Sequence, residues 1–437
     1  MSPNRAANLV ALVCAVLAFA GFTIADRPDR PAPSSTECEG DNAGLTLPDG
    51  FCATVFADGL GRVRHILVDP HGIVFAAVGR SRRDTAAAVG AIALRDSDSD
   101  GVSDVQHRLG DVGGHGIALY QNYIYFAPND RVLRYTLHWG TMETTGGPET
   151  IISGLPARGS HAAKSIVVTE DGVLYVNIGS PTNSCQEEDR TAGSPGQDPC
   201  PQLETRAGIW KFDANQTDQT QADGERFATG IRNAVAIALS PDDGALWGLQ
   251  HGRDQLGQSW PDLFTDEENA ELPSEELLTI AEGDNFGWPY CYHDPGLGRR
   301  VLAPEYGGDG SEAGRCADMV DPIEVFPAHW APNALLFYNG ERFPERYRGG
   351  AFIAFHGSWN RAPQPQGGYN VVFLPLENGR PAGDWEVFAD GFAGEDVSPR
   401  GADHRPTGLA LGPDGALYVS DDSGGRIYRI VYVGEAR

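Results

Sequence analysis

The chain has 437 residues and a formal net charge of −27 at pH 7, which disfavours nucleic acid and anionic membranes as partners because both repel an acidic surface. Its 55 glycines and 30 prolines argue against long helices and favour a turn-rich fold. A β-propeller reaches this length as a single domain.

The N-terminus has the features of an export signal. Arg5 precedes an apolar run from Leu9 to Ile24, and small residues follow up to Ala25. This pattern predicts a signal peptide or a signal anchor over residues 1–25, and a secreted or periplasmic protein. Residues 26–44 are rich in Pro, Ser and Asp, as in a linker. No later segment is apolar enough to span a membrane.

The cysteines fit an exported chain. Removal of Cys14 with the signal leaves six cysteines, and an even number of cysteines in an exported chain predicts disulfides. Proximity favours three pairs, although other connectivities stay open: Cys38–Cys52, Cys185–Cys200 and Cys291–Cys316. The sequence contains no CxxC zinc pattern and no CxxCH haem site.

One pattern recurs along the rest of the chain, a turn with Asp and Gly followed by alternating apolar residues, which predicts β-hairpins. The clearest copies are VDPHGIVFAAVG (68–79), VTEDGVLYVNIG (168–179), LSPDDGALWGL (239–249) and LGPDGALYVS (411–420). Weaker copies are ALYQNYIYFAP, from residue 118, and RGGAFIAFHGS, from residue 348.

The spacing of the turn glycines sets the number of repeats. Gly72 and Gly172 are 100 residues apart, which leaves room for two units, and Gly244 follows 72 residues later. We therefore predict an all-β fold over residues 45–435, a six-bladed β-propeller of four-stranded antiparallel blades. Seven blades and a pair of β-sandwiches are the alternatives.

Units of about 65 residues exceed the ~40–50 of tight repeat families, so long loops must decorate one face. The longest, 180–206 and 253–345, show no strand pattern and are typical of site-building loops. Within the second, Asp262–Ile280 suggests a short acidic helix.

An acidic loop lies early in the chain. In RDSDSDGVSD, alternate carboxylates precede a glycine, like the first half of a calcium-binding EF-hand loop. The carboxylates are Asp96, Asp98, Asp100 and Asp104. The twelfth position holds His107 instead of a bidentate Glu, so a solvated hairpin tip is the alternative to a structural calcium site.

Charged residues recur just before the innermost strand of several units. Arg64, Arg232 and Arg405 occupy this position, and so does His161. In a propeller such positions line the central axis, so we expect an anion site there, because guanidinium groups match carboxylates. His161 is a candidate general base, although most such histidines are only hydrogen-bonded.

Three glycine- and aromatic-rich segments complete the candidate site. They are QHGRDQLG (250–257), GDNFGWPYCY (283–292) and FHGSWNR (355–361). They fit either closely packed loops or an aromatic platform over a planar ligand.

In combination and order, these motifs resemble the glucose/sorbosone dehydrogenase family over roughly residues 45–433. The resemblance implies a six-bladed propeller that holds pyrroloquinoline quinone (PQQ) and calcium on its axis and oxidises a sugar. Since no haem motif is fused to the chain, it also implies an external electron acceptor, a cytochrome or a quinone.

The resemblance assigns roles to individual residues. His161 matches the catalytic base, and the carbonyls of Gly252 and Arg253 match calcium ligands. The implied cofactor contacts are Arg64, Lys164, Arg232, Asn233, His356, Trp359, Arg361 and Arg405. Lys164 stands where relatives usually carry Arg, which puts a bidentate contact there in doubt.

Two other functional classes stay open. A calcium-dependent propeller lactonase or other hydrolase would need side-chain carboxylates and Asn on the axis, whereas Arg and His are predicted there. A non-catalytic propeller that binds a glycan or a protein would not need His161.

Overall fold

The computed structural model describes residues 1, 40–80, 89–138 and 140–434. All of its helices and strands belong to the unit Glu37–Arg437. The predicted signal and most of the predicted linker lie outside the described residues, as does Cys38. Among the described helices, none has the length and apolar character needed to cross a membrane.

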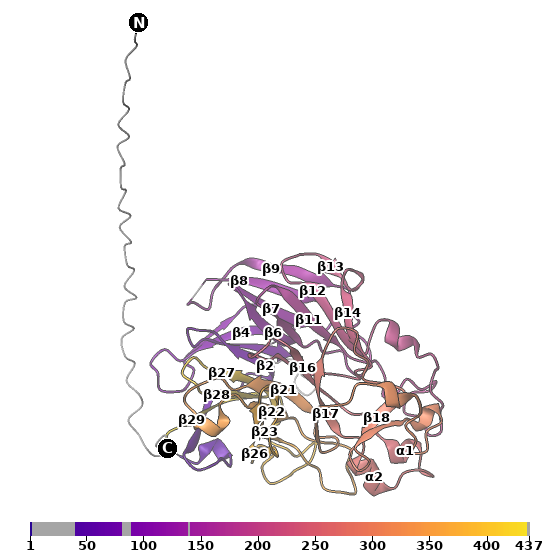
Figure 1. The fold of residues 1–437 in the computed structure, drawn as a ribbon. Coiled ribbons are helices and arrows are strands. Elements are labelled where there is room, and N and C mark those ends of the chain that lie inside the picture. Colours follow the sequence, from indigo (N-terminus) through magenta and orange to yellow (C-terminus); the bar gives the residue numbers. More distant parts are fainter. Residues whose placement is uncertain (2–39, 81–88, 139, 435–437) are drawn as a thin grey trace. The chain divides into compact units, whose positions relative to one another are not determined.

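Six sheets, here called blades A to F, are arranged in a ring (Figure 1). Blade A contains β2 (Arg62–Val68), β3 (Val74–Gly79), β4 (Gly90–Arg95) and β5 (Val105–Arg108). Blade B contains β6 (Gly114–Tyr120), β7 (Tyr123–Pro128), β8 (Val132–Leu137) and β9 (Thr144–Ser153), with β13 (Gln219–Thr220) paired in parallel to β9. Blade C contains β10 (Ile166–Val168), β11 (Val173–Ile178), β12 (Gly208–Asp213) and β14 (Glu225–Thr229).

Blade D contains β15 (Ala236–Leu239), β16 (Leu246–Gln250), β17 (Glu275–Ile280) and β20 (Glu324–Phe326). Blade E contains β21 (Pro332–Phe337), β22 (Ala351–Phe355), β23 (Asn370–Leu374) and β26 (Glu386–Ala389). Blade F contains β27 (Pro406–Leu411), β28 (Leu417–Asp421), β29 (Arg426–Tyr432) and β1 (Phe51–Ala57).

Short elements decorate the blades. Two small hairpins are β18 (Cys291–Asp294) with β19 (Arg299–Leu302) and β24 (Leu376–Glu377) with β25 (Arg380–Pro381). The helices are α1 (Leu256–Ser259) and α2 (Asp266–Glu271), and the 3₁₀ turns are η1 (Asn42–Gly44), η2 (Pro201–Glu204), η3 (Gln221–Asp223), η4 (Pro304–Tyr306), η5 (Gly314–Asp318) and η6 (Glu345–Tyr347).

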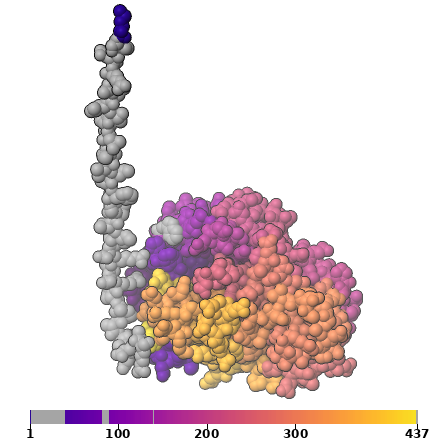
Figure 2. Space-filling model, in the orientation of Figure 1, coloured from indigo at the N-terminus to yellow at the C-terminus, as the bar shows by residue number. Residues whose placement is uncertain are grey.

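The ring closes through its two ends. The innermost strands β2, β6, β10, β15, β21 and β27 each contact the next, and β27 contacts β2. β1, from the start of the described domain, pairs with β29 from its end, so the last blade is completed by the first strand. In Figure 2 the indigo and yellow surfaces therefore adjoin. This pairing protects an edge that would otherwise be open.

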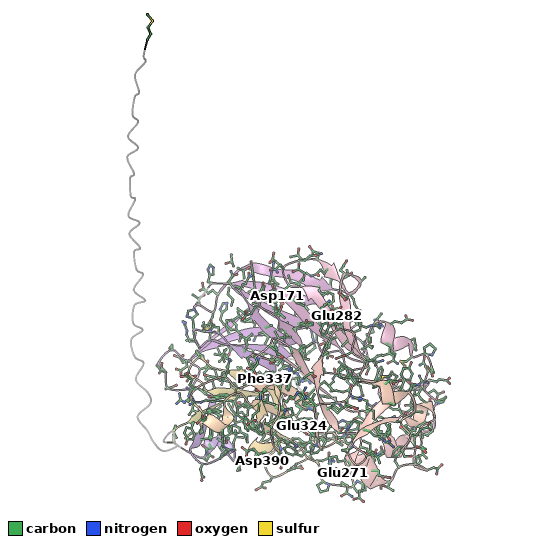
Figure 3. The ribbon with its side chains drawn as sticks, viewed as in Figure 1. Asp171, Glu271, Glu282, Glu324, Phe337 and Asp390 are labelled. Atoms are coloured by element: carbon green, nitrogen blue, oxygen red, sulfur yellow. A yellow bond between two sulfur atoms is a disulfide. The ribbon has the colours of Figure 1, made fainter. Side chains whose placement is uncertain are left out.

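The core lies between neighbouring blades. Phe337 of blade E packs edge-on against Trp247 of blade D, with ring centroids 5.2 Å apart. Carboxylates such as Asp171, Glu271 and Asp390 are exposed at the periphery (Figure 3). Because each sheet has two faces to bury, only stacking between neighbours supplies a continuous core.

The predicted six-bladed propeller is confirmed. The four turn glycines Gly72, Gly172, Gly244 and Gly415 each lie in the turn just before the second strand of a different blade, with φ of 81°, 90°, 71° and 78°. The two weaker copies correspond to the hairpin β6–β7 and to β22.

The prediction that residues 253–345 lack strands was wrong, since β17, β20 and the start of blade E lie there. Within the predicted acidic helix Asp262–Ile280, only Asp266–Glu271 is helical, and Glu275–Ile280 is a strand. Glu275 and Glu276 are buried, so two acidic residues that look like a surface helix belong to an interior strand.

The disulfides Cys185–Cys200 and Cys291–Cys316 are confirmed. Each closes a loop of the segments that decorate blades C and D. The third predicted pair includes Cys38 and stays a prediction.

Candidate functional site

The candidate residues of the inner strands lie at one end of the propeller axis. In each antiparallel blade, the start of the first strand lies beside the end of the second, as in the pairing of Pro406 with Asp421. Residues that precede first strands and residues that follow second strands therefore meet at the same end. The long loops after β11, β16 and β22 leave from this end, which confirms the prediction that long loops decorate one face.

Irregular pairing marks the same end of the inner strands. The register shifts between Val63 and Ile66 in β2 and between Gly114 and Gly116 in β6. Similar shifts occur at the starts of β21 and β27. A bulge frees a residue from the regular alternation and redirects its side chain. In this way Arg64 and His115 become buried polar residues at the axial end.

His161 has the state that a general base requires. Its Nδ1 lies 2.8 Å from the carbonyl oxygen of Ser180, which can only accept, so Nδ1 carries the proton. Among the described residues no group hydrogen-bonds to its Nε2. Burial, followed by the charge of Arg232, lowers the pKa of His161 well below its usual value. The ring is therefore neutral, with a lone pair free on Nε2.

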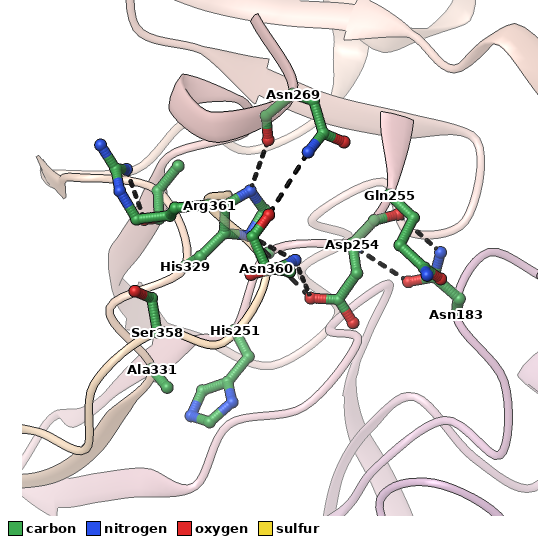
Figure 4. A network of polar contacts seen from close by, with 12 residues as sticks. Asn183, His251, Asp254, Gln255, Asn269, His329, Ala331, Ser358, Asn360 and Arg361 are labelled. Carbon is green, nitrogen blue, oxygen red and sulfur yellow. Dashed lines mark hydrogen bonds and ion pairs between the residues drawn. The ribbon is translucent and has the colours of Figure 1, made fainter. Parts of the chain in front are cut away.

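Arg232 is fixed by a buried carboxylate. Its guanidinium is 2.9 Å from Asp254, and Asp254 also contacts Arg190 at 2.9 Å. The amide of Asn360 donates to the other oxygen of Asp254 at 3.0 Å (Figure 4). Burial would raise the pKa of Asp254, but the charges of Arg232, His329 and Arg190 together outweigh burial and lower the pKa. Asp254 is thus ionised, and Arg232 is held in one orientation.

A second cluster lies across the axis. Asp422 pairs with Arg64 and accepts a hydrogen bond from His356 at 2.7 Å. Arg64 also donates from Nε to Nδ1 of His115, at 2.8 Å. Burial lowers the pKa of Arg64 to about 10 and that of His356 to about 4. Arg405 joins this cluster, because its Nε donates to the carbonyl of His356 at 2.9 Å.

The loop that follows β16 carries the predicted calcium ligands. The N–H of Gly252 donates to Glu275 at 2.8 Å, and the N–H of Asp254 donates to Asn183 at 2.9 Å. Burial raises the pKa of Glu275 to about 8. No donor among the described residues reaches the carbonyl oxygens of Gly252 or Arg253. These are the two free acceptors of an otherwise fixed loop.

Two further predicted cofactor residues, Lys164 and Asn233, are hydrogen-bonded to nearby segments of the protein. Lys164 donates from Nζ to the carbonyls of Pro156 and Ala162, and burial lowers its pKa to about 7. The side-chain oxygen of Asn233 accepts from Asn177 at 3.0 Å. These contacts fix the segments around His161 and Arg232.

Trp359 lies at the edge of the Asp254 cluster, beside Arg190, whereas Arg361 holds α2. Arg361 donates to the carbonyls of Ala270 and Ala328 and pairs with Glu271, so it secures the end of α2. Trp359 is 49% exposed, with the guanidinium of Arg190 5.9 Å from its ring centroid. Neither residue contacts Arg64 or Arg232 within the described part of the chain.

The acidic loop lies apart from the axis, between the two outer strands β4 and β5 of blade A. One oxygen from each of Asp96, Asp98 and Asp100 lies within 4.8 Å of the others. Asp104 instead accepts a hydrogen bond from the N–H of Ser97 at 2.8 Å. The first three carboxylates therefore converge, and the fourth closes the loop.

Sequence reasoning missed the acidic partners of the arginines. Asp254 and Asp422 follow the second strands of blades D and F, within QHGRDQLG and SDD. Because antiparallel pairing brings the ends of second strands to the same place, those positions were a usable signal.

The fold and the axial residues together define a six-bladed β-propeller with buried arginines, histidines and carboxylates gathered at one end of its axis. The chain belongs to the TrAA12-like family, whose match covers residues 45–433. This confirms the family resemblance predicted from the motifs.

Named relatives agree with this assignment. A pyrroloquinoline quinone-dependent sugar dehydrogenase of Hypocrea jecorina is 24% identical over 423 residues, covering 90% of this chain and 92% of that protein. An uncharacterized protein of Borreliella burgdorferi is 31% identical over 210 residues, covering 48% of this chain and 49% of that protein. The second match thus spans about half of the relative's length.

Solved structures show the same fold. A calcium structure of the Trichoderma reesei family AA12 enzyme has a TM-score of 0.72 at 22% identity, covering 89% of this chain and 97% of that chain. The holo form of the PQQ domain of Coprinopsis cinerea pyranose dehydrogenase has a TM-score of 0.72 at 21% identity, covering 90% of this chain and 98% of that one.

Proposed function

We propose that this protein is a PQQ- and calcium-dependent oxidoreductase that oxidises an aldose or a related sugar. The electrons then pass to an external acceptor, a cytochrome or a quinone. The observation that carries the proposal is the neutral His161, with a free Nε2, at the same axial end as Arg64 and Arg232. The names of the related sugar and pyranose dehydrogenases support it.

The axial residues fit such a cofactor. PQQ is a planar tricarboxylate, and a protein of net charge −27 needs a local group of cations to hold it. Arg64, Arg232 and Arg405 supply planar guanidinium donors that match carboxylates. Asp254 and Asp422 keep the first two in place, and the carbonyl of His356 orients Arg405.

The loop after β16 fits calcium. Calcium in proteins prefers oxygen ligands, including backbone carbonyls. Gly252 and Arg253 present two consecutive carbonyl oxygens that no described donor occupies. We assign these two oxygens as the protein ligands of the catalytic ion.

Bound at this end, PQQ would supply the redox chemistry and calcium would supply Lewis-acid polarisation. The chain itself supplies the base. Nε2 of His161 takes the proton of the sugar hydroxyl, and the carbonyl of Ser180 stabilises the resulting imidazolium through Nδ1–H. Arg232 lies close enough to lower the pKa of His161, so the proton is released readily after the reaction.

The test is a titration of purified apo-protein with PQQ and calcium, followed by assays with a panel of sugars and a dye acceptor. We expect saturable PQQ binding and dye reduction that depends on both additions. Absence of both would overturn the proposal. Hydrolysis of lactones with calcium alone would assign the site to a propeller hydrolase, and sugar binding without turnover would assign it to a non-catalytic propeller.

We further propose that the domain works outside the cytoplasm. Two disulfides support this, since such bonds persist mainly in oxidising compartments. Fractionation of cells that express the full chain would test it, and recovery with reduced cysteines in the cytosol would contradict it.

A further inference from the structure

The loop formed by residues 251–254 is held on both sides by buried partners. Nε2 of His251 lies 2.8 Å from the carbonyl of Pro332, and the N–H of His251 donates to Asn233 at 2.9 Å. The N–H of Gly252 donates to the buried carboxyl of Glu275. The backbone of this loop therefore has little freedom before any ligand binds.

The side chain of Arg253 extends from this loop into the interior. It is 4% exposed, and its guanidinium pairs with Glu305, whose side chain is 0% exposed. Glu305 also accepts hydrogen bonds from the indole of Trp260 at 3.2 Å and from the hydroxyl of Ser184 at 3.1 Å. One buried carboxylate thus ties together the loop after β11, the loop after β16 and the turn η4.

The rest of the guanidinium borders a small cavity of about 10 Å³. Nε and Nη2 of Arg253 and the hydroxyl of Tyr292 have no hydrogen-bond partner within the described residues. A cavity of this size holds about one water molecule. A water there would complete the hydrogen bonds of Arg253 that Glu305 does not satisfy.

We propose that the Arg253–Glu305 pair is a positioning device for the carbonyl oxygens of Gly252 and Arg253. The pair anchors residue 253 from the interior, while Glu275 anchors the N–H of Gly252. With both anchors in place, the two carbonyls keep their direction before a cation arrives. Such preorganisation raises affinity because less ordering remains to be done on binding. The inference rests on the proposed function, which supplies the cation.

A second buried ion pair provides a matched control. Arg300 contacts Glu276 at 2.6 Å, with both side chains almost fully buried. Neither side chain hydrogen-bonds to residues 251–254. Loss of this pair should cost stability by the same mechanism, an uncompensated buried charge, without disturbing the calcium loop.

The experiment measures calcium binding in the presence of saturating PQQ by isothermal titration calorimetry, with thermal unfolding in parallel. Every protein compared, wild type included, also carries Asp98→Asn and Asp100→Asn, so that the acidic loop adds no calcium signal. We expect Arg253→Met and Glu305→Gln each to weaken calcium affinity by about 10–100-fold, as loss of a supporting partner does at metal sites. The double variant should lose little more than either single one, because the two groups act as a unit. Arg300→Met should lower the unfolding temperature and leave calcium affinity unchanged.

The outcomes are distinguishable. If the protein with an intact axial loop binds no calcium in the presence of PQQ, the proposed function and this inference are both overturned. Wild-type protein that binds calcium, with a folded Arg253→Met variant of equal affinity, would overturn this inference alone. If Arg253→Met does not fold, Arg253→Lys keeps the charge beside Glu305 but loses the planar fork. It should bind calcium more weakly than wild type, and unchanged affinity would again overturn the inference.

Discussion

Two regions of this molecule were expected to bind calcium, and they are built in opposite ways. In the acidic loop the carboxylates are mostly exposed, and they accept hydrogen bonds from their own loop: Asp96 from Gly101 N–H at 2.9 Å, and Asp100 from Val102 N–H at 2.8 Å. In the axial loop the free oxygens belong to the backbone of Gly252 and Arg253. Two buried glutamates fix this loop: Glu275 accepts the N–H of Gly252, and Glu305 pairs with the side chain of Arg253.

The comparison shows that an obvious pattern of ligands is not the same as a preorganised site. The acidic loop is conspicuous in sequence, but water and local amides compete for its oxygens. The axial loop has no acidic signature, because its ligands are carbonyls and its supports come from Glu275 and Glu305, further along the chain. If function resides in the axial region, changes there should have the largest effects.

The largest effect is expected for His161→Ala. Loss of a general base should lower kcat by about 10²–10⁴-fold while PQQ binding stays unchanged. Because the pKa of His161 is lowered, the base form persists into acid, so the acidic limb of the wild-type kcat profile should lie below the usual pKa of about 6.5. Dye-reduction kinetics across pH would check both points, and full activity of the variant would remove His161 from the mechanism.

Arg232→Met should weaken PQQ binding by about 10–100-fold, the value of a charge-assisted hydrogen bond. Asp254 keeps Arg190 as a partner at 2.9 Å, so the variant should fold. Fluorescence titration with PQQ would measure the loss. Arg346→Met, which removes an exposed pair with Glu386, is the control and should bind like wild type. Equal affinity of both variants would place the cofactor elsewhere.

Lys164→Met should change how the free energy of unfolding depends on pH, because Lys164 is a buried lysine near the axial region. The folded pKa of Lys164 is lowered to about 7 by burial, so between pH 7 and about 10.4 the unfolded chain binds the extra proton. The stability of wild type relative to the variant should therefore rise with pH across this window and be flat below it. Urea unfolding at several pH values measures this. Lys211→Met, at an exposed lysine whose pKa is raised, should show no such rise.

The smallest effect is expected for the pair Asp98→Asn and Asp100→Asn in the acidic loop. If calcium binds here, its loss should lower the unfolding temperature in calcium by about 1–3 °C without changing kcat. Calorimetry with and without a chelator would detect it. Identical unfolding temperatures in calcium would favour the solvated hairpin tip, and a fall in kcat would contradict the separation of the two regions.

Much of the architecture followed from short windows of sequence. The Asp-Gly turns and the alternating apolar residues gave the hairpins, and the spacing of Gly72, Gly172, Gly244 and Gly415 gave the number of blades. The positions of His161, Arg64 and Arg232 at strand starts followed in the same way. These features are local, because turn geometry and strand alternation depend on neighbouring residues.

The tertiary structure alone decided the partners of those residues. Arg64 and Asp422 are separated by 358 positions, and they meet only because β1 closes the ring against β29. Burial also decided placements that the sequence did not show: Glu275 belongs to an interior strand, and Lys164 donates to the carbonyls of Pro156 and Ala162. The sequence by itself determined the repeat and the residues at its axial end. The charge state and orientation of those residues depend on desolvation and long-range pairs, which exist only once the ring is closed.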